Sequence, residues 1–184
     1  MTPIQRVVLV GLMGAGKSTV GPLLAHRLGW RFLDLDGEIE RLAAQSVPEI
    51  FSTRGEAGFR QLEAEATAQL AGRADIVIAA GGGWMAQPEM PERLGPGTFI
   101  VWLQVTPRAV LARLGTGDSG RPLLAGAEPA VRLEQLLAER EAAYSRAHAA
   151  VGTDGLHPAK VAAAVEGLIR RTALVKSTQD RNGS

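Results

Sequence analysis

The sequence has no cysteine, no marked excess of charge of either sign and no long apolar run. Without cysteine the chain can form no disulfide, thiolate zinc site, iron–sulfur cluster or cysteine nucleophile. Its 20 Lys and Arg residues against 19 Asp and Glu residues leave a formal charge of +1, which gives no general electrostatic attraction to nucleic acid or anionic membranes. The apolar run from Val7 to Val10 is too short for a signal-peptide core or a membrane span. We therefore expect a cytoplasmic protein with neither nucleic acid nor membrane as a partner.

The composition is that of one globular domain. The chain has 184 residues, 46% of them apolar, which suffices for a single core. Short β-branched segments alternate with longer segments of helical composition, a pattern typical of β-α-β units around a parallel sheet. No internal repeat and no linker between two cores is visible. We predict a single α/β domain over residues 1–171, with helices on both faces of a five-stranded parallel sheet.

The predicted elements follow from the spacing of apolar residues. Strands are predicted over residues 6–10, 31–33, 76–79, 98–105 and 149–152. Helices are predicted over residues 17–28, 59–70, 107–114, 129–148 and 158–170. Pro107, Pro129 and Pro158 each suit a first helical turn, where the missing N–H group is not needed.

Two segments lack this spacing. Residues 115–126 are rich in glycine, contain one Asp and one Arg, and lie between two predicted helices. We expect a mobile loop of the kind that serves as an active-site lid, with an inert surface loop as the alternative. Residues 172–184 are polar and end in Asn-Gly-Ser, so we predict a disordered tail.

A glycine-rich segment links the first predicted strand to a predicted helix. Its sequence is Gly11-Leu12-Met13-Gly14-Ala15-Gly16-Lys17-Ser18-Thr19, which fits the phosphate-binding pattern G-x-x-x-x-G-K-S/T. Glycines let backbone N–H groups surround an anion, and the helix N-terminus adds about half a positive charge. Lys17 would reach the β and γ phosphates, and Ser18 would offer its hydroxyl group to Mg²⁺. A turn without a ligand explains neither side chain, so the segment predicts binding of ATP or GTP.

Phosphate binding alone does not identify the reaction, because P-loop proteins include kinases, GTPases, motors and DNA-handling ATPases. The sequence contains no guanine-reading N-K-x-D motif, which weakens a GTPase interpretation. The absent basic excess argues against a DNA-handling machine. A domain of this size has room for a small acceptor molecule.

Two carboxylates, Asp34 and Asp36, follow the second predicted strand. Strand alternation would send both to one face, at the end of the sheet where the P-loop also lies. One carboxylate can serve Mg²⁺, and the other can accept a hydrogen bond or a proton from an attacking hydroxyl group. In the structural alternative Asp36 caps a helix that begins near Gly37, a role not available to Asp34.

Other residues suit an acidic acceptor. Arg60 and Glu63 share a predicted helical face, so Glu63 can hold the guanidinium group ready for a substrate carboxylate. The alternative is that Arg60 and Glu63 form an ordinary solvent-exposed salt bridge on the helix, with no role in binding. The triplet Gly81-Gly82-Gly83 suggests a close approach to the backbone, with a loose loop as the alternative.

These segments together resemble the shikimate kinase family, in order across nearly the whole chain. The matching segments are the P-loop, Asp34-x-Asp36, the block Phe51…Gly55-Glu56…Phe59-Arg60…Glu63, the glycine triplet, Arg121-Pro122-Leu123-Leu124 and Arg140…Tyr144. The first motif is common to all P-loop enzymes, whereas the later five, in this order, are specific. The resemblance implies a three-layer, nucleoside-monophosphate-kinase-like fold with a mobile lid. It also implies transfer of the γ-phosphoryl group of ATP to the 3-hydroxyl group of shikimate.

The resemblance implies roles for individual residues. Catalytic roles fall to Lys17, Asp36 and Arg121, with Asp36 the candidate base, and Mg²⁺ would be held by Ser18 and Asp34. ATP would contact Gly14, Ala15, Gly16, Lys17, Ser18, Thr19, Arg113, Arg121 and Pro158. Shikimate would contact Asp36, Phe51, Phe59, Arg60, Gly81, Gly82, Gly83 and Arg140. Arg60 and Arg140 would grip its carboxylate, and the two phenylalanines would form apolar walls.

Two other interpretations are weighed against this one. A related small-metabolite kinase such as gluconate kinase would share the P-loop but would not predict Arg60, the glycine triplet and Arg121 together. A regulatory module that has lost turnover would have no chemical need to keep all five of Lys17, Ser18, Asp34, Asp36 and Arg121. Trp84-Met85 is bulkier than the small residue expected after the triplet, which predicts either a reshaped pocket edge or an altered substrate. We expect the protein to be a monomer.

Overall fold

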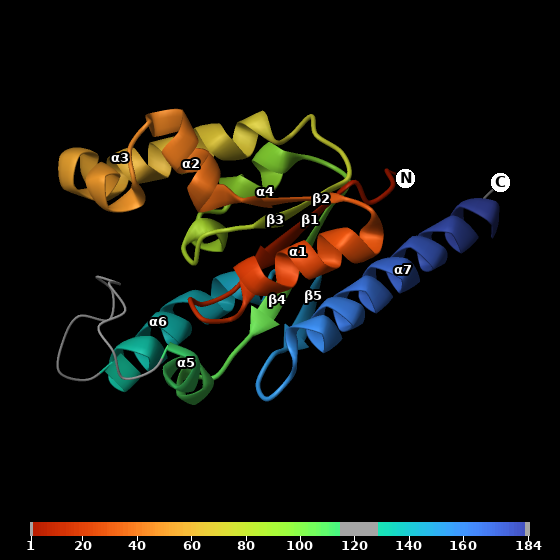
Figure 1. The fold of residues 1–184 in the computed structure, drawn as a ribbon. Helices are drawn as coiled ribbons and strands as arrows, with labels where there is room; N and C mark the ends of the chain where they lie inside the picture. Colours follow the sequence, from red (N-terminus) through yellow and green to blue (C-terminus); the bar gives the residue numbers. More distant parts are fainter. Residues whose placement is uncertain (1, 115–128, 183–184) are drawn as a thin grey trace.

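The computed structural model describes residues 2–114 and 129–182 (Figure 1). In these ranges five parallel strands form one sheet, in the order β2-β3-β1-β4-β5. The strands are β1 (Arg6–Val10), β2 (Arg31–Asp34), β3 (Ile76–Ala79), β4 (Thr98–Gln104) and β5 (Ala149–Gly152). The predicted five-stranded parallel sheet is confirmed, with strand ends shifted by no more than one residue.

The centre of the sheet is the core of the molecule. All residues of β1 and β3 are buried, and so are the inner residues of β4. Central parallel strands are covered on both faces, which explains their unbroken apolar sequences. The edge strands β2 and β5 are partly exposed.

Helices cover both faces of the sheet (Figure 1). On one face α1 (Lys17–Leu28) packs against α7 (Pro158–Asn182), and α4 (Glu89–Leu94) and α6 (Pro129–Tyr144) lie on the other. The remaining helices are α2 (Leu35–Ala43), α3 (Val47–Gln69), α5 (Pro107–Leu114) and the short 3₁₀ helix η1 (Trp84–Ala86). No helix within the described ranges is both long and apolar enough to cross a membrane.

Several helix ends differ from the prediction. α3 begins at Val47 because Ser46 and Glu49 form a capping box. It is kinked at Gly55, whose φ of 66° is not helical, so its first turns lie on a separate helical segment from the predicted one over residues 59–70. α6 ends at Tyr144, before the predicted end at His148. α7 continues to Asn182, where a disordered tail from Thr172 was expected; no glycine or proline lies between Thr172 and Asn182 to end the helix. The predicted lid, residues 115–126, lies outside the described residues.

Candidate active site

The P-loop occupies the turn between β1 and α1. Gly14 and Gly16 have φ angles of 74° and 94°, which side chains with a Cβ atom rarely adopt. A Cβ atom on Gly11 would lie 2.5 Å from the carbonyl oxygen of Leu103. Gly16 is the N-cap of α1 and provides no side-chain hydrogen bond to the helix. The first N–H groups of α1 are therefore available to an anion, as the sequence pattern predicts.

Lys17, the first residue of α1, folds its side chain back onto this loop. Its Nζ atom donates hydrogen bonds to the carbonyl oxygens of Gly11, at 2.8 Å, and Leu12, at 2.9 Å. The ammonium group is thereby held beside the anion site. A phosphate group in the loop would offer it a stronger, charged acceptor.

The hydroxyl group of Ser18 and the carboxylate of Asp34 meet beside the P-loop. Ser18 Oγ donates to Asp34 Oδ2 at 2.7 Å, and the other carboxylate oxygen accepts a hydrogen bond from the backbone of Asp36 at 3.2 Å. Asp34 is thus the N-cap of α2. The structural alternative had assigned capping to Asp36, and this assignment was wrong: Asp36 lies in the first turn of α2. The change from strand to helix, and not strand alternation, places these two carboxylates together.

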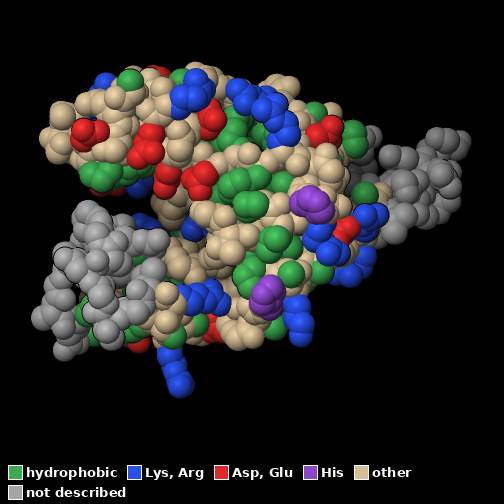
Figure 2. All heavy atoms as spheres, viewed as in Figure 1, with side chains coloured by type: hydrophobic (Ala, Val, Ile, Leu, Met, Phe, Trp, Pro, Cys, Tyr) green, Lys and Arg blue, Asp and Glu red, His purple; other side chains and the backbone are tan. Residues whose placement is uncertain are grey.

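The carboxyl group of Asp36 is a weaker acid than an ordinary aspartate. Desolvation of its carboxyl group, together with the negative charges of Asp34 and Glu63, raises its pKa to about 6. Lys17 opposes this shift. A carboxyl group with this pKa can exchange a proton near neutral pH, as a general base requires. Figure 2 shows Asp and Glu side chains gathered beneath α2 and α3, at the edge of a hollow in this face.

Arg60 is held in one orientation by two carboxylates of α3. Its Nη1 atom donates to Glu63 Oε2 at 2.7 Å, and its Nη2 atom donates to Glu56 Oε1 at 3.2 Å. Glu63 is fully buried, so its pairing with Arg60 is not a solvent-exposed salt bridge. The Phe59 ring lies 5.5 Å from the guanidinium carbon and stacks at 4.7 Å on Phe51. The predicted contact between Arg60 and Glu63 is present, beside an aromatic wall.

Charged side chains approach the backbone of the glycine triplet. A Cβ atom on Gly82 would lie 2.7 Å from Nη1 of Arg140, and one on Gly83 would lie 2.5 Å from Nη2 of Arg60. The two guanidinium groups, one from α6 and one from α3, therefore reach neighbouring residues of one loop. This confirms the predicted close approach and excludes the loose-loop alternative.

The first glycine of the triplet faces acidic groups. A Cβ atom on Gly81 would lie 3.1 Å from Glu63 Oε1 and 3.5 Å from Asp36 Oδ1. The loop is also fixed from α6, because the Tyr144 hydroxyl group donates to the carbonyl oxygen of Gly82 at 2.6 Å. The loop thus lies between the acidic residues near the P-loop and the two arginines.

Trp84 and Met85 are buried, each with 1% of its surface exposed. The Trp84 indole nitrogen donates to Thr67 Oγ1 at 3.0 Å, and the carbonyl oxygen of Met85 accepts from Arg146 at 2.6 Å. Their bulk fills the core beneath the loop, contrary to the expectation that it reshapes the pocket edge.

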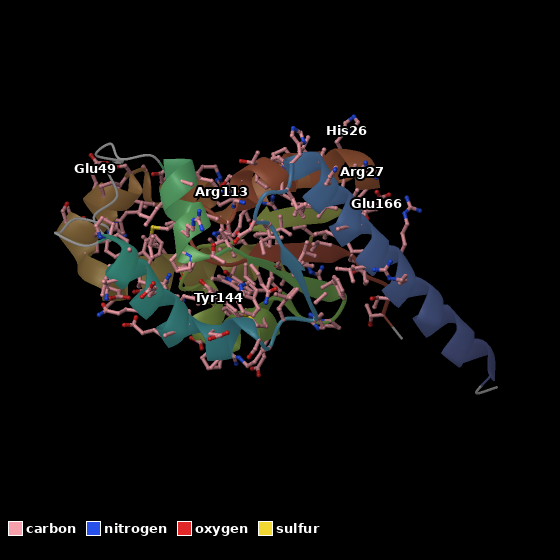
Figure 3. All side chains as sticks on the ribbon, turned by 90° about the horizontal axis from the view of Figure 1, so that it is seen from below. His26, Arg27, Glu49, Arg113, Tyr144 and Glu166 are labelled. Atoms are coloured by element: carbon pink, nitrogen blue, oxygen red, sulfur yellow. The ribbon has the colours of Figure 1, made fainter. Side chains whose placement is uncertain are left out.

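Arg113 connects the P-loop to the loop before α7 (Figure 3). Its Nη1 atom donates to the carbonyl oxygen of Gly14 at 2.8 Å, and its Nη2 atom donates to that of Thr153 at 2.6 Å. Pro158 begins α7 at the end of the same loop. Thr153 was not predicted, because its sequence neighbours form no phosphate-binding or ligand-binding pattern. Arg121 lies outside the described residues.

Comparison with known proteins gives consistent matches. The family model described as shikimate kinase matches residues 13–170. A shikimate kinase from Synechococcus sp. (strain RCC307) is 48% identical over 147 residues, which are 80% of this chain and 75% of that protein. One from Moorella thermoacetica is 46% identical over 156 residues, which are 85% of this chain and 89% of that protein. The solved structure of a shikimate kinase from Acinetobacter baumannii in complex with shikimate matches with a TM-score of 0.86 and 37% identity, over 93% of this chain and 96% of that one.

Proposed function

The chain belongs to the shikimate kinase family, and from its geometry we infer how its residues carry out that family's reaction. It is an ATP-dependent kinase that transfers the γ-phosphoryl group to the 3-hydroxyl group of shikimate. The observation that supports our assignment of residues is the convergence of Arg60 and Arg140 on one glycine loop whose other end faces Asp36. This spacing suits a small molecule with a carboxylate at one end and hydroxyl groups at the other.

The arginines bind the acceptor. Guanidinium groups pair with carboxylates through parallel, charge-assisted hydrogen bonds. Glu63 fixes the orientation of Arg60 before the substrate arrives, so less side-chain entropy is lost on binding. Phe51 and Phe59 supply apolar contact to a carbon ring. The backbone of Gly81, Gly82 and Gly83 closes the site, because these positions have no Cβ atom that would displace the charged side chains.

ATP occupies the P-loop. Gly14, Ala15, Gly16, Lys17, Ser18 and Thr19 surround its phosphates, and the Lys17 ammonium group exchanges its loop carbonyl acceptors for phosphate oxygens. Arg113 and Pro158 line the adenine side. Arg121, from the segment outside the described residues, neutralises charge on the transferring group.

Ser18 and Asp34 suit Mg²⁺. Their oxygen atoms lie 2.7 Å apart, and both are the hard donors that this ion prefers. Within the described ranges no group of three acidic or histidine side chains could hold a metal, which agrees with an ion completed by nucleotide phosphates and water. When bound, Mg²⁺ neutralises charge on the phosphates.

The protein contributes mainly position and electrostatics to the transfer. The arginine pair holds shikimate with its 3-hydroxyl group toward Asp36, in line with the γ phosphate in the P-loop. The ionised Asp36 accepts a hydrogen bond from this hydroxyl group and takes its proton as the new bond from the hydroxyl oxygen to the γ phosphorus forms. The bond from the γ phosphorus to the β–γ bridging oxygen breaks in the same transfer, and ADP leaves with that oxygen. We propose that the protein acts as a monomer and that residues 1–171 form one catalytic domain.

The test is ADP release in a coupled assay with ATP and Mg²⁺, supplied separately with shikimate, quinate and gluconate. We expect turnover with shikimate alone, and its loss in Lys17→Ala. In Arg60→Ala, calorimetry should show weaker shikimate binding. Equal binding by this variant and the parent would refute the carboxylate assignment, and turnover with gluconate alone would favour the related-kinase alternative. Light scattering on a sizing column checks the monomer.

A further inference from the structure

Gln87 is the C-cap residue of η1 and reaches the buried carboxylate behind Arg60. Its side-chain Nε2 atom donates to Glu63 Oε2 at 2.6 Å. The same oxygen atom accepts the 2.7 Å hydrogen bond from Arg60 Nη1. Gln87 and Arg60 therefore meet at one atom, although they come from different elements and Gln87 takes no part in the motifs of the P-loop or the glycine triplet.

The environment of Glu63 makes this second donor important. The residue has no exposed surface, and a buried carboxylate without enough hydrogen-bond donors is strongly unfavourable. Its other oxygen atom, Oε1, has no hydrogen-bond partner among the described residues. Side-chain stabilisation of this charge thus comes from Arg60 and Gln87 at a single oxygen, and removal of Gln87 would leave only the arginine.

The element that carries Gln87 is itself fixed to the same turn of α3. The Trp84 indole nitrogen donates to Thr67 Oγ1 at 3.0 Å, and the Thr67 hydroxyl group donates to the Glu63 carbonyl oxygen at 2.7 Å. Both Trp84 and Thr67 are buried. η1 consequently presents the Gln87 amide from a rigid base, which is what a positioning contact requires.

We propose that Gln87 is a positioning residue for acceptor specificity: its amide group fixes the Glu63 carboxylate, which in turn fixes Arg60 against the substrate carboxylate. The inference rests on the proposed role of Arg60 in binding shikimate. Gln87 does not touch the substrate itself. Its loss should loosen the arginine and weaken shikimate binding, while the P-loop and ATP binding stay unchanged.

Three substitutions at this position separate hydrogen bonding from size, because the new side chains are of similar length. Gln87→Lys retains a donor to Glu63, Gln87→Met neither donates nor accepts a strong hydrogen bond, and Gln87→Glu places a second carboxylate beside the first. We expect KM for shikimate to rise about five- to tenfold in Gln87→Met, more in Gln87→Glu and least in Gln87→Lys. KM for ATP should change by less than about twofold in all three.

A matched control lies on α3. Gln61 donates to Glu65 at 3.3 Å on the exposed surface, so Gln61→Met removes a hydrogen bond of the same kind that does not involve Glu63 or Arg60, and should leave both KM values unchanged. A second measurement tests the connection: in an Arg60→Met background, Gln87→Met should raise KM for shikimate no further.

Equal changes in KM for ATP and shikimate, an undiminished effect in the Arg60→Met background, or normal KM values in Gln87→Met would each overturn the proposal. Failure of the Arg60 assignment would look different, because Arg60→Met itself would then bind shikimate as the parent does. Thermal unfolding of each variant identifies any loss of fold, and Gln87→Lys keeps the test decisive if Gln87→Glu does not fold.

Discussion

The side chain of Arg140 lies so close to the backbone of Gly82 that a Cβ atom there would be 2.7 Å from its Nη1 atom. The contact joins α6 to the loop after β3, and only glycine leaves room for it. One turn later on α6, the Tyr144 hydroxyl group bonds the carbonyl oxygen of the same glycine at 2.6 Å. The position of one arginine thus depends on a backbone contact and on a neighbour that does not bind substrate.

Gly82→Ala should therefore impair shikimate binding. The added methyl group must displace the guanidinium group, and we expect KM for shikimate to rise about tenfold or more, because small misplacements of a binding group have large effects. KM for ATP should stay within about twofold. Steady-state kinetics with each substrate varied in turn measures both values.

Gly72→Ala is the matched control for this substitution. Nothing lies within 4 Å of a Cβ atom built at Gly72, so this variant carries the same chemical change without a steric consequence. Its kinetic constants should equal those of the parent. A Gly82→Ala enzyme with an unchanged KM for shikimate would contradict the assignment of Arg140.

Tyr144→Phe tests the second contact. Tyr144 has no exposed surface, and removal of its hydroxyl group leaves the Gly82 carbonyl oxygen without this donor, which should lower the free energy of unfolding by about 1–2 kcal/mol. The ring can keep its packing against Trp102, at 5.6 Å between centroids. Urea unfolding should show a lower midpoint with an unchanged slope. An unchanged midpoint would mean that the hydrogen bond contributes no net stability.

The nucleotide site was predictable because its information is local. A strand, a glycine turn and a helix beginning at Lys17 follow one another in the chain, so spacing alone predicts that the P-loop N–H groups face an anion. The pairing of Arg60 with Glu63 was equally local, since residues three apart on a helix are neighbours. The capping residue was not predicted correctly: strand alternation had been applied to Asp34 and Asp36, with Asp36 as the possible cap, but the chain changes from β2 to α2 directly after Asp34, which is the N-cap.

The acceptor side depends on contacts between distant segments. The partners of Gly82 and Gly83 come from α6 and α3, and no pattern around the triplet indicates which side chains approach it. The hydrogen bond from Gln87 to Glu63 is another contact of this kind, because the two residues lie 24 positions apart in the chain. Such contacts require the tertiary arrangement, so the glycine triplet could predict only that a close approach exists.

The raised pKa of Asp36 predicts the acid limb of activity. Desolvation, Asp34 and Glu63 raise this pKa to about 6, and the reaction needs the ionised carboxylate as hydrogen-bond acceptor. The value of kcat/KM for shikimate should therefore fall below a midpoint near pH 6 at saturating ATP. Asp36→Asn should lose this limb along with about a hundredfold or more of kcat. A parent profile that stays flat down to pH 5 would contradict the role of Asp36.

The same shift predicts a conflict between function and stability at this residue. Because the folded-state pKa of Asp36 lies above its ordinary value of 3.8, the folded state binds the proton more tightly than the unfolded chain does. Ionisation therefore lowers stability progressively as the pH rises from about 4 through 6. Asp36→Asn removes this penalty and should have a higher Tm than the parent at pH 7.5, with a smaller difference at pH 4.5. Scanning calorimetry at both values tests the sign, and a variant less stable at pH 7.5 would refute it.

Arg113 should affect the other substrate. Its guanidinium group bonds the carbonyl oxygens of Gly14 and Thr153 at 2.8 and 2.6 Å, and so holds the P-loop against the loop before α7. Arg113→Met removes these two bonds and a third to Thr153 Oγ1 at 3.1 Å, while keeping much of the apolar side chain. We expect KM for ATP to rise about tenfold with KM for shikimate nearly unchanged. Arg108→Met, at a neighbouring position of α5, is the control and should leave both constants unaltered. If Arg113→Met raised KM for shikimate instead, this arginine would belong to the acceptor site, and the proposed division of the site between the two substrates would be wrong.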